Sequence, residues 1–301
     1  MKRPIIINQK KQRDGWREWL HTVFWAGLIA IVFRSFLLEP FNIPSGSMIP
    51  TLHVGDHLFV SKWNYGYSRF SFPFGSWNLW DGRMFEFGAP RRGDVIVFRN
   101  TIADADYVKR LIGMPGDTIQ MKSGRLYINN IMVERVEPAR YVIANISKRY
   151  KDDGVQHKDL FIKGNKISQA DGAEANFNYT IEYKDDDICR RIPAECMIED
   201  AVEWIEILPG GVKHRIVEIS DYERFDNTEP FKVPDNHYFM MGDDRDHSAD
   251  SRSAGLGYVP YDNLMGKAWV IFYSHNYFSP VPFVWDWPEK MRWGRYGMIV
   301  K

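Results

Sequence analysis

Gly93-Asp94-Val95-Ile96-Val97-Phe98-Arg99 decides the fold class, because a turn dipeptide leads directly into a short β-branched and apolar run. The same pattern recurs along the chain. It predicts strands at residues 57–61, 94–99, 107–112, 118–121 and 125–128. No helical segments alternate with these runs, so the sequence predicts antiparallel β-structure and not a parallel α/β sheet.

Two more strands are predicted at residues 237–241 and 267–273, and the core is expected to close by pairing them with early strands. Between the early and late strands, residues 134–227 are richer in charged and polar side chains. We interpret this region as an inserted β-rich cap that is solvated and carries no chemistry. The predicted fold is therefore mostly β, with a barrel-like antiparallel core, this insertion and one N-terminal transmembrane helix.

The composition excludes several classes of protein. The 301 residues are 45% hydrophobic and 15% aromatic, which is enough to bury a core and excludes a disordered chain. Basic and acidic residues balance at 39 each, so no net charge attracts the chain to nucleic acid. The mean hydropathy of −0.38 excludes a polytopic membrane protein.

The N-terminal segment is the exception to this polar average. Residues 19–38 are mostly apolar, which predicts a membrane-spanning helix, although a secretory signal or a buried core helix shares this pattern. Lysines and arginines precede the segment, so the N-terminus is expected in the cytoplasm. The predicted parts are a cytoplasmic N-terminus (1–18), an anchor (19–38), two parts of a catalytic core (39–133 and 228–301, the second ending in an aromatic tail) and the cap region (134–227).

Two features of the sequence remain open. The two cysteines, Cys189 and Cys196, could form a short disulfide loop or stay as separate thiols, because sequence separation does not fix the distance between them. Residues 63–87 and 278–296 are dense in aromatic side chains, which could fill a core or contact a bilayer.

A candidate nucleophile lies just after the apolar segment, in Pro44-Ser45-Gly46-Ser47-Met48-Ile49-Pro50. No Gly-x-Ser-x-Gly and no Ser-x-x-Lys motif accompanies this serine, so a base would have to come from elsewhere in the sequence. Tyr107-Val108-Lys109-Arg110 follows about sixty residues later and offers a lysine flanked by apolar residues. Together the two segments suggest a serine nucleophile paired with a lysine base.

Four ordered segments carry a resemblance to a known family. They are Glu39-Pro-Phe-Asn-Ile-Pro-Ser-Gly-Ser-Met-Ile-Pro-Thr-Leu52, Arg92-Gly-Asp-Val-Ile-Val-Phe98, Tyr107-Val-Lys-Arg-Leu-Ile-Gly-Met-Pro-Gly-Asp117 and Gly242-Asp-Asp-Arg-Asp-His-Ser-Ala-Asp-Ser-Arg252. In sequence and in order they resemble the signature boxes of bacterial type I signal peptidases. The resemblance covers most of the core outside the insertion.

This resemblance implies that Ser47 is the nucleophile and Lys109 the general base. It implies an oxyanion hole from the Ser45 hydroxyl and the Ser47 N–H, and a hydrogen bond from Ser248 that orients the lysine amine. A lysine acts as a base only when neutral, so its pKa must fall from about 10.4 to near 8, a penalty of roughly 3 kcal/mol on the ammonium form. Burial is the most direct source of that penalty.

The resemblance also assigns supporting residues. A structural ion-pair network is expected from Arg110, Asp243, Arg245, Asp250 and Arg252, and the interleaved arginines argue against a metal site there. Asp244 and His247 depart from the family pattern, which often has asparagine at both positions. Small side chains of a peptide cleaved after an Ala-x-Ala-like motif are expected in shallow pockets lined by Ile43, Met48, Leu52, Tyr107 and Val108.

The sequence thus predicts a monomeric, membrane-anchored serine endopeptidase that removes signal peptides from exported preproteins. It is expected to act at the outer face of a bacterial cytoplasmic membrane, with its catalytic domain periplasmic or extracytoplasmic. Its expected partners are preproteins and the lipid bilayer, without nucleic acid, metal or organic cofactor. Two alternatives are a self-cleaving repressor-type protease, which would carry a DNA-binding helix-turn-helix in place of residues 19–38, and a nonenzymatic membrane-tethered interaction module.

Overall fold

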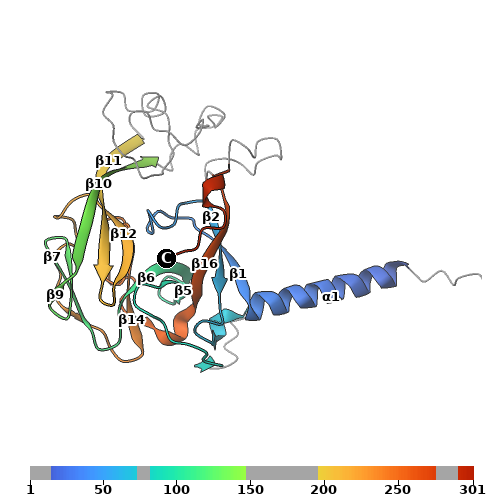
Figure 1. The fold of residues 1–301 in the computed structure, drawn as a ribbon. Helices are drawn as coiled ribbons and strands as arrows, with labels where there is room; N and C mark the ends of the chain where they lie inside the picture. The colour runs from blue at the N-terminus through green and yellow to red at the C-terminus, as the bar shows by residue number, and fades with distance from the viewer. Residues whose placement is uncertain (1–14, 73–81, 147–195, 276–290) are drawn as a thin grey trace, which may run out of the picture.

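The computed structural model describes residues 15–72, 82–146, 196–275 and 291–301, with the side chains of residues 140–146 and 196–200 excepted. Figure 1 shows one long helix that projects from a β-rich body. The helix α1 (Gly15–Phe36) is 22 residues long and has a mean hydropathy of 1.4 over its most apolar window, so its length and composition suffice to cross a membrane. It begins four residues before the predicted segment and ends at Phe36, and the helix-turn-helix of a repressor is not found within residues 15–36.

The main sheet has seven strands in the order β1-β2-β16-β5-β6-β14-β15, and its strand pairs are antiparallel. The strands are β1 (Leu38–Asn42), β2 (Asp56–Ser61), β5 (Val95–Asn100), β6 (Ala105–Gly113), β14 (His237–Met241), β15 (Val259–Pro260) and β16 (Leu264–Ser274). The late strand β16 lies between β2 and β5, and β14 pairs with β6. This confirms the prediction that the core closes by pairing late strands with early ones.

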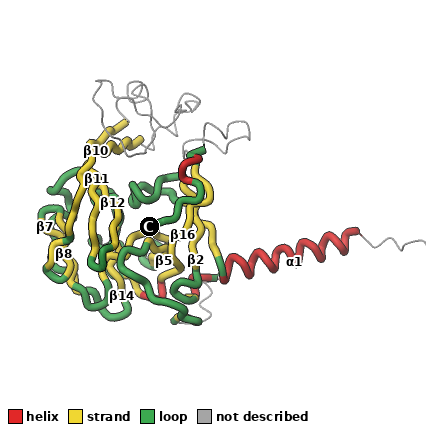
Figure 2. Tube along the Cα trace, in the orientation of Figure 1, coloured by secondary structure: helices red, strands yellow, loops and turns green. Residues whose placement is uncertain are grey.

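Smaller sheets flank the main one, as the strands in Figure 2 show. These smaller sheets have four, three and two strands, and the three-stranded sheet belongs to the inserted region. The four-stranded sheet contains β7 (Thr118–Lys122), β8 (Arg125–Ile128), β9 (Ile131–Met132) and β13 (Phe231–Lys232), and the two-stranded sheet contains β3 (Tyr67–Ser68) and β4 (Arg83–Met84). Short 3-10 turns occur at Arg69–Ser71, Tyr261–Asn263 and Trp293–Arg295.

The inserted region is β-rich where it is described. Its three-stranded sheet consists of β10 (Glu134–Ile146), β11 (Cys196–Leu208) and β12 (Val212–Glu218). Leu208 joins a core cluster with Ile112 of β6 and Phe239 of β14, so the insertion shares a hydrophobic core with the main sheet. Cys189 lies outside the described residues, and the predicted alternatives for the two cysteines stay open.

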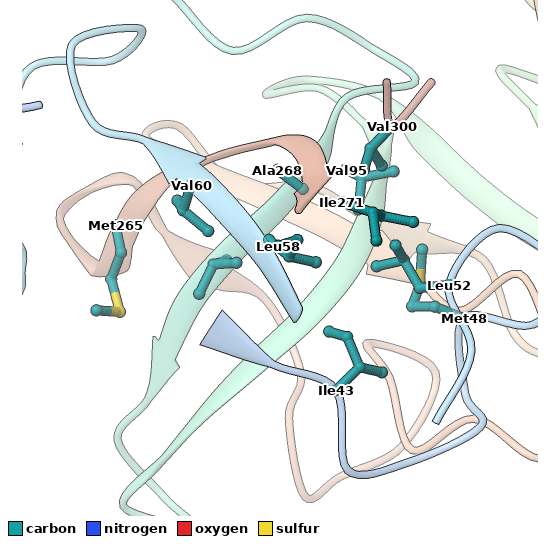
Figure 3. Close-up of a cluster of buried hydrophobic side chains, with 11 residues drawn as sticks. Ile43, Met48, Leu52, Leu58, Val60, Val95, Met265, Ala268, Ile271 and Val300 are labelled. Atoms are coloured by element: carbon teal, nitrogen blue, oxygen red, sulfur yellow. The ribbon is translucent and has the colours of Figure 1, made fainter. Parts of the chain in front are cut away.

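One apolar cluster fixes the segment that follows β1. Figure 3 shows Ile43, Met48 and Leu52 packed against side chains of the main sheet, with Leu58 and Val60 on β2, Val95 on β5 and Ile271 on β16. Leu52 and Leu58 are fully buried. Burial of such side chains stabilises the fold by about 1.5–3 kcal/mol each. The loop between β1 and β2 is therefore held at both ends by the core.

Candidate active site

Ser47 lies on a turn whose flanks are anchored. The Ile49 N–H donates to the Gly46 carbonyl at 2.8 Å, and the Leu52 N–H donates to the Met48 carbonyl at 2.8 Å. Met48 and Leu52 are buried in the core, whereas Ser47 itself is only half-buried. The local sequence therefore presents one hydroxyl at the surface of a rigid support.

Lys109 reaches this hydroxyl from the middle of β6. Its backbone lies opposite Ile96 of β5, and its Nζ atom is hydrogen-bonded to Ser47 Oγ. The side chain is only 4% exposed, although lysine is almost never buried without a partner. The structure therefore brings the predicted nucleophile and the predicted base into direct contact.

The pKa of Lys109 is lowered to about 8, and burial is the main cause. Asp250, Asp243 and Asp244 raise this pKa, while Arg252 lowers it. A lysine with a pKa of about 8 is neutral in about a tenth of the molecules at pH 7, whereas an ordinary lysine is neutral in fewer than about one in a thousand. An uncharged amine beside a hydroxyl can accept the proton of that hydroxyl when it attacks a carbonyl carbon.

Asp243 is compensated by Arg110. The Arg110 guanidinium donates to both carboxylate oxygens at 2.7 and 2.6 Å, and it also donates to the Gly93 carbonyl at 2.8 Å. Burial alone would raise the pKa of Asp243, but Arg110 holds that pKa below its usual value. Two facing charges in a dry environment thereby neutralise each other through a bidentate contact.

Asp250 is compensated by Arg252 in the same way. Arg252 donates to its two oxygens at 2.9 and 2.8 Å, and the Gly242 N–H donates to one of them at 3.0 Å. Burial opposes the charged form, but Arg252 keeps the pKa of Asp250 below its usual value. Because both nearby carboxylates are paired, their attraction for the lysine ammonium is reduced and burial dominates its pKa.

Arg245 takes a partner that the sequence analysis did not name. It donates to Glu206 on β11 in a bidentate contact, with an Nη1 distance of 2.9 Å to Oε1. Glu206 also lies 3.3 Å from Arg135 and 3.4 Å from His214. The expectation that the insertion is a solvated cap is therefore wrong at this strand, because a buried carboxylate of the insertion pairs with Arg245 of the segment Gly242–Arg252. The available signal was a single acid within the apolar run 205–208.

The two serines predicted to assist have different environments. Ser45 is exposed on the turn before Ser47. Ser248 is buried, but its Oγ has no hydrogen-bond partner among the described residues, so the contact with Lys109 expected from the resemblance is not formed.

Asp244 and His247, which depart from the family pattern, lie 3.4 Å apart, and the Asp244 N–H donates to the Ser47 carbonyl at 3.3 Å.

Three of the five predicted pocket residues are core residues. Ile43, Met48 and Leu52 are buried in the cluster beneath the turn, where they pack against side chains of the main sheet. Their side chains are needed to hold the turn in place. Tyr107 and Val108 are partly exposed on β6. A cavity of about 640 Å³ lies elsewhere, lined among others by Trp63, Arg91 and Trp269, and none of the predicted site residues lines it.

Gly242 is a further site residue that the sequence analysis quoted without a role. A Cβ added there would lie 2.2 Å from Ser248 Oγ and 2.5 Å from the Ser47 carbonyl oxygen. A side chain at this position would therefore displace either the nucleophile turn or the Ser248 segment. Only a missing side chain allows the two to approach the end of β14 so closely.

We expect Gly242→Ala to lower kcat/KM for peptide cleavage by about 100-fold, because a displacement of the reacting groups by about 1 Å can cost that much. Gly255→Ala is the matched control, since its nearest neighbour to an added Cβ is Ser253 Oγ at 4.0 Å. Steady-state kinetics on both variants check the expectation. Equal rates for Gly242→Ala and the control would contradict it.

Several known proteins are similar to this chain in sequence. The family model "Signal peptidase, peptidase S26" matches residues 16–273. The signal peptidase I of Rickettsia typhi (strain ATCC VR-144 / Wilmington) is 34% identical over 255 residues, which cover 82% of this chain and 76% of the relative. The signal peptidase I of Rickettsia prowazekii (strain Madrid E) is also 34% identical, with the same coverage.

A solved structure gives a much weaker likeness. The crystal structure of a signal peptidase I from Enterococcus faecalis V583 aligns with 60% of this chain and 96% of its own, at a TM-score of 0.25 and 21% identity. That score supports no conclusion. The match over most of the chain to the family model, and the sequence identity to curated relatives, show that this chain belongs to the signal peptidase family, peptidase S26, and is a serine peptidase that acts on signal peptides.

Proposed function

We propose that this chain is a membrane-anchored endopeptidase that cleaves signal peptides from exported preproteins after an Ala-x-Ala-like motif, using Ser47 as nucleophile and Lys109 as general base. One observation carries the proposal: Lys109 Nζ is buried and hydrogen-bonded to Ser47 Oγ. Family membership gives the class of substrate, and this contact supports the assignment of the two roles.

The reaction follows from this geometry. Neutral Nζ takes the hydroxyl proton while Ser47 Oγ attacks the scissile carbonyl carbon, and the carbonyl oxygen becomes an oxyanion. The Ser47 N–H and the Ser45 hydroxyl are the proposed donors to that oxyanion. The ammonium then protonates the departing amine, which leaves an ester on Ser47. Neutral Nζ next takes a proton from a water molecule that attacks the ester, and the protonated lysine returns a proton to Oγ.

The ion pairs support this chemistry indirectly. Arg110 with Asp243 and Arg252 with Asp250 neutralise two carboxylates that otherwise hold the lysine in its charged form. The ion pair between Arg245 and Glu206 holds the segment Gly242–Arg252 against the insertion. Ser248 remains a proposed orienting residue, because its buried hydroxyl has no other hydrogen bond among the described residues.

The proposed location rests on α1 and on its surroundings. The helix is apolar and mostly unburied, and basic residues precede it, so we place the N-terminus in the cytoplasm and the β-rich body across the membrane.

The Tyr67 hydroxyl donates to the Phe36 carbonyl at 2.7 Å, and the two rings lie 5.4 Å apart. Phe85 and Phe87, in the same aromatic segment, are 66% and 68% exposed. These side chains are suited to contact lipid near the end of the anchor. Residues 278–290 of the second aromatic segment lie outside the described residues.

A peptidyl acylating inhibitor tests the two catalytic roles. We expect it to add one adduct per chain at Ser47, identified by mass spectrometry of the digested protein. Because only the neutral amine accepts a proton, the rate of acylation should rise by about tenfold per pH unit at pH values well below about 8 and level off at higher pH. An adduct on another residue, or a rate that does not change between pH 6 and 9, would refute the assignment.

A further inference from the structure

Three carboxylates from separate segments converge beside the Gly242–Arg252 box. Glu218 ends β12, Asp226 lies in the loop that follows, and Asp246 lies after β14. One oxygen atom of each lies within 4.8 Å of the others. The sequence analysis predicted no metal site, and these three residues share no motif spacing that could have shown one.

Each carboxylate is held in place through one of its two oxygen atoms, which accepts a hydrogen bond. Glu218 Oε2 accepts from Arg135. Asp226 Oδ2 accepts from the Glu223 N–H, and Asp246 Oδ2 accepts from the Ile219 N–H at 2.6 Å. These contacts fix the orientation of all three side chains.

The other oxygen of each carboxylate has no such contact. Glu218 Oε1, Asp226 Oδ1 and Asp246 Oδ1 are all buried without a hydrogen-bond partner among the described residues. Glu218 is 3% exposed and Asp226 is fully buried. Unpartnered buried carboxylate oxygens are costly, and a bound ion or water is one of the few explanations for them.

The nearby arginines are shared with or paired to other acids, so they do not balance the charge of these three carboxylates. Arg135 is shared between Glu218 and Glu206, Arg245 pairs with Glu206, and Arg252 pairs with Asp250. When all the acids are ionised, Arg135 and Arg245 face four carboxylates, those of Glu206 and of the three cluster residues, so the local charge is negative and incompletely balanced.

We infer that Glu218, Asp226 and Asp246 bind a divalent cation, and that the cation is calcium. Carboxylates alone, without nitrogen or sulfur, are the ligands of hard cations and not of zinc. Calcium–oxygen distances of about 2.3–2.6 Å allow two ligands to lie up to about 5 Å apart, whereas magnesium limits them to about 4 Å. Oxygens that lie within 4.8 Å of one another can thus all bind calcium. Water completes the coordination shell.

The cation joins three parts of the fold. It connects the end of β12, the loop around Asp226 and the segment after β14. Asp246 precedes Ser248 by two residues and follows Asp243 by three, so the ion stabilises the segment that contacts the Ser47 turn. Its expected effect is on the stability of the folded chain, independently of whether Ser47 and Lys109 perform catalysis.

Thermal unfolding of the full chain in detergent tests the site. The protein is freed of metal with a chelator and titrated with CaCl2 from about 10⁻⁵ to 10⁻¹ M, which extends to about 100 times the dissociation constants of about 10⁻⁴ to 10⁻³ M that are typical of extracellular calcium modules. At a concentration about 100 times the dissociation constant we expect the Tm of the wild type to rise by about 5 °C. Glu218→Gln and Asp226→Asn should show no rise, and in chelator they should melt at or above the wild-type Tm, because the amides remove charge repulsion.

Glu223→Gln is the matched control, since Glu223 is an exposed acid of the same loop and should leave the calcium response unchanged. Equilibrium dialysis with radioactive calcium should show one ion bound per wild-type chain and none bound by Asp226→Asn. An unchanged wild-type Tm across the titration, an equal rise in Asp226→Asn, or a response to MgCl2 without one to CaCl2 would each overturn the inference.

Discussion

Replacing Lys109 with methionine is expected to lower kcat/KM for preprotein cleavage by about 10³- to 10⁴-fold, because the variant loses the amine that is hydrogen-bonded to Ser47 Oγ and placed to accept its proton. Methionine fills a similar volume without a charge, so the core around β6 is preserved. Ser47→Ala should abolish formation of the acyl-enzyme altogether. Because the two residues act as one unit, the double variant should be no slower than Ser47→Ala alone.

The Lys109 variant should not be less stable than the wild type. The folded state disfavours the ammonium form, so the pKa of Lys109 is lower when folded than when unfolded. Between pH 8 and about 10.4 the unfolded chain therefore binds more protons at this residue, and below pH 8 the lysine adds a constant cost to folding. Methionine removes that cost.

Cleavage of a purified preprotein in detergent measures the effect, and urea unfolding confirms that the fold is intact. Lys122→Met, at an exposed lysine of β7, is the control and should keep full activity. Turnover by Lys109→Met within tenfold of the wild type would rule out the lysine as the base.

The sequence located β2, β5, β6, β7, β8, β14 and β16, and it named Ser47 and Lys109, which the structure brings into contact. Turn residues before apolar runs placed the strands within two or three residues, because short strands with buried faces have few alternative registers. Ser47 and Lys109 were found through local motifs, since each is fixed by its own turn or strand. Their contact depends on the loop after β1 packing against the sheet, which no local pattern encodes.

Residues that act across the fold were harder to find. Glu206 is distant in sequence from Arg245, and its role depends on how the insertion docks on β14. Gly242 matters because two other segments approach it, and this appears only in three dimensions. The pocket prediction for Met48 and Leu52 stays a prediction, because their burial shows that they anchor the turn of Ser47 and leaves open whether they also contact a substrate side chain.

The second large effect is expected on stability, from Arg110→Ala. Both Arg110 and Asp243 are buried, with side chains 0% and 1% exposed, and their closest contact is 2.6 Å. Removing the arginine leaves an unpaired carboxylate in the interior, which typically destabilises a protein by about 3–5 kcal/mol. The variant also loses donors to Gly93 and to the Lys301 carbonyl. Urea unfolding followed by tryptophan fluorescence measures the loss.

Arg99→Ala provides the contrast, because Arg99 forms ion pairs with Asp104 and Asp106 near the surface. Such exposed pairs contribute about 0–1 kcal/mol. Arg110→Met combined with Asp243→Leu should recover most of the stability lost in Arg110→Ala, since replacing a whole buried pair with apolar groups is often neutral. If the double variant were as unstable as Arg110→Ala, the loss would come from packing or backbone contacts of Arg110. An effect of Arg110→Ala no larger than that of Arg99→Ala would show that the buried pair does not hold the site together.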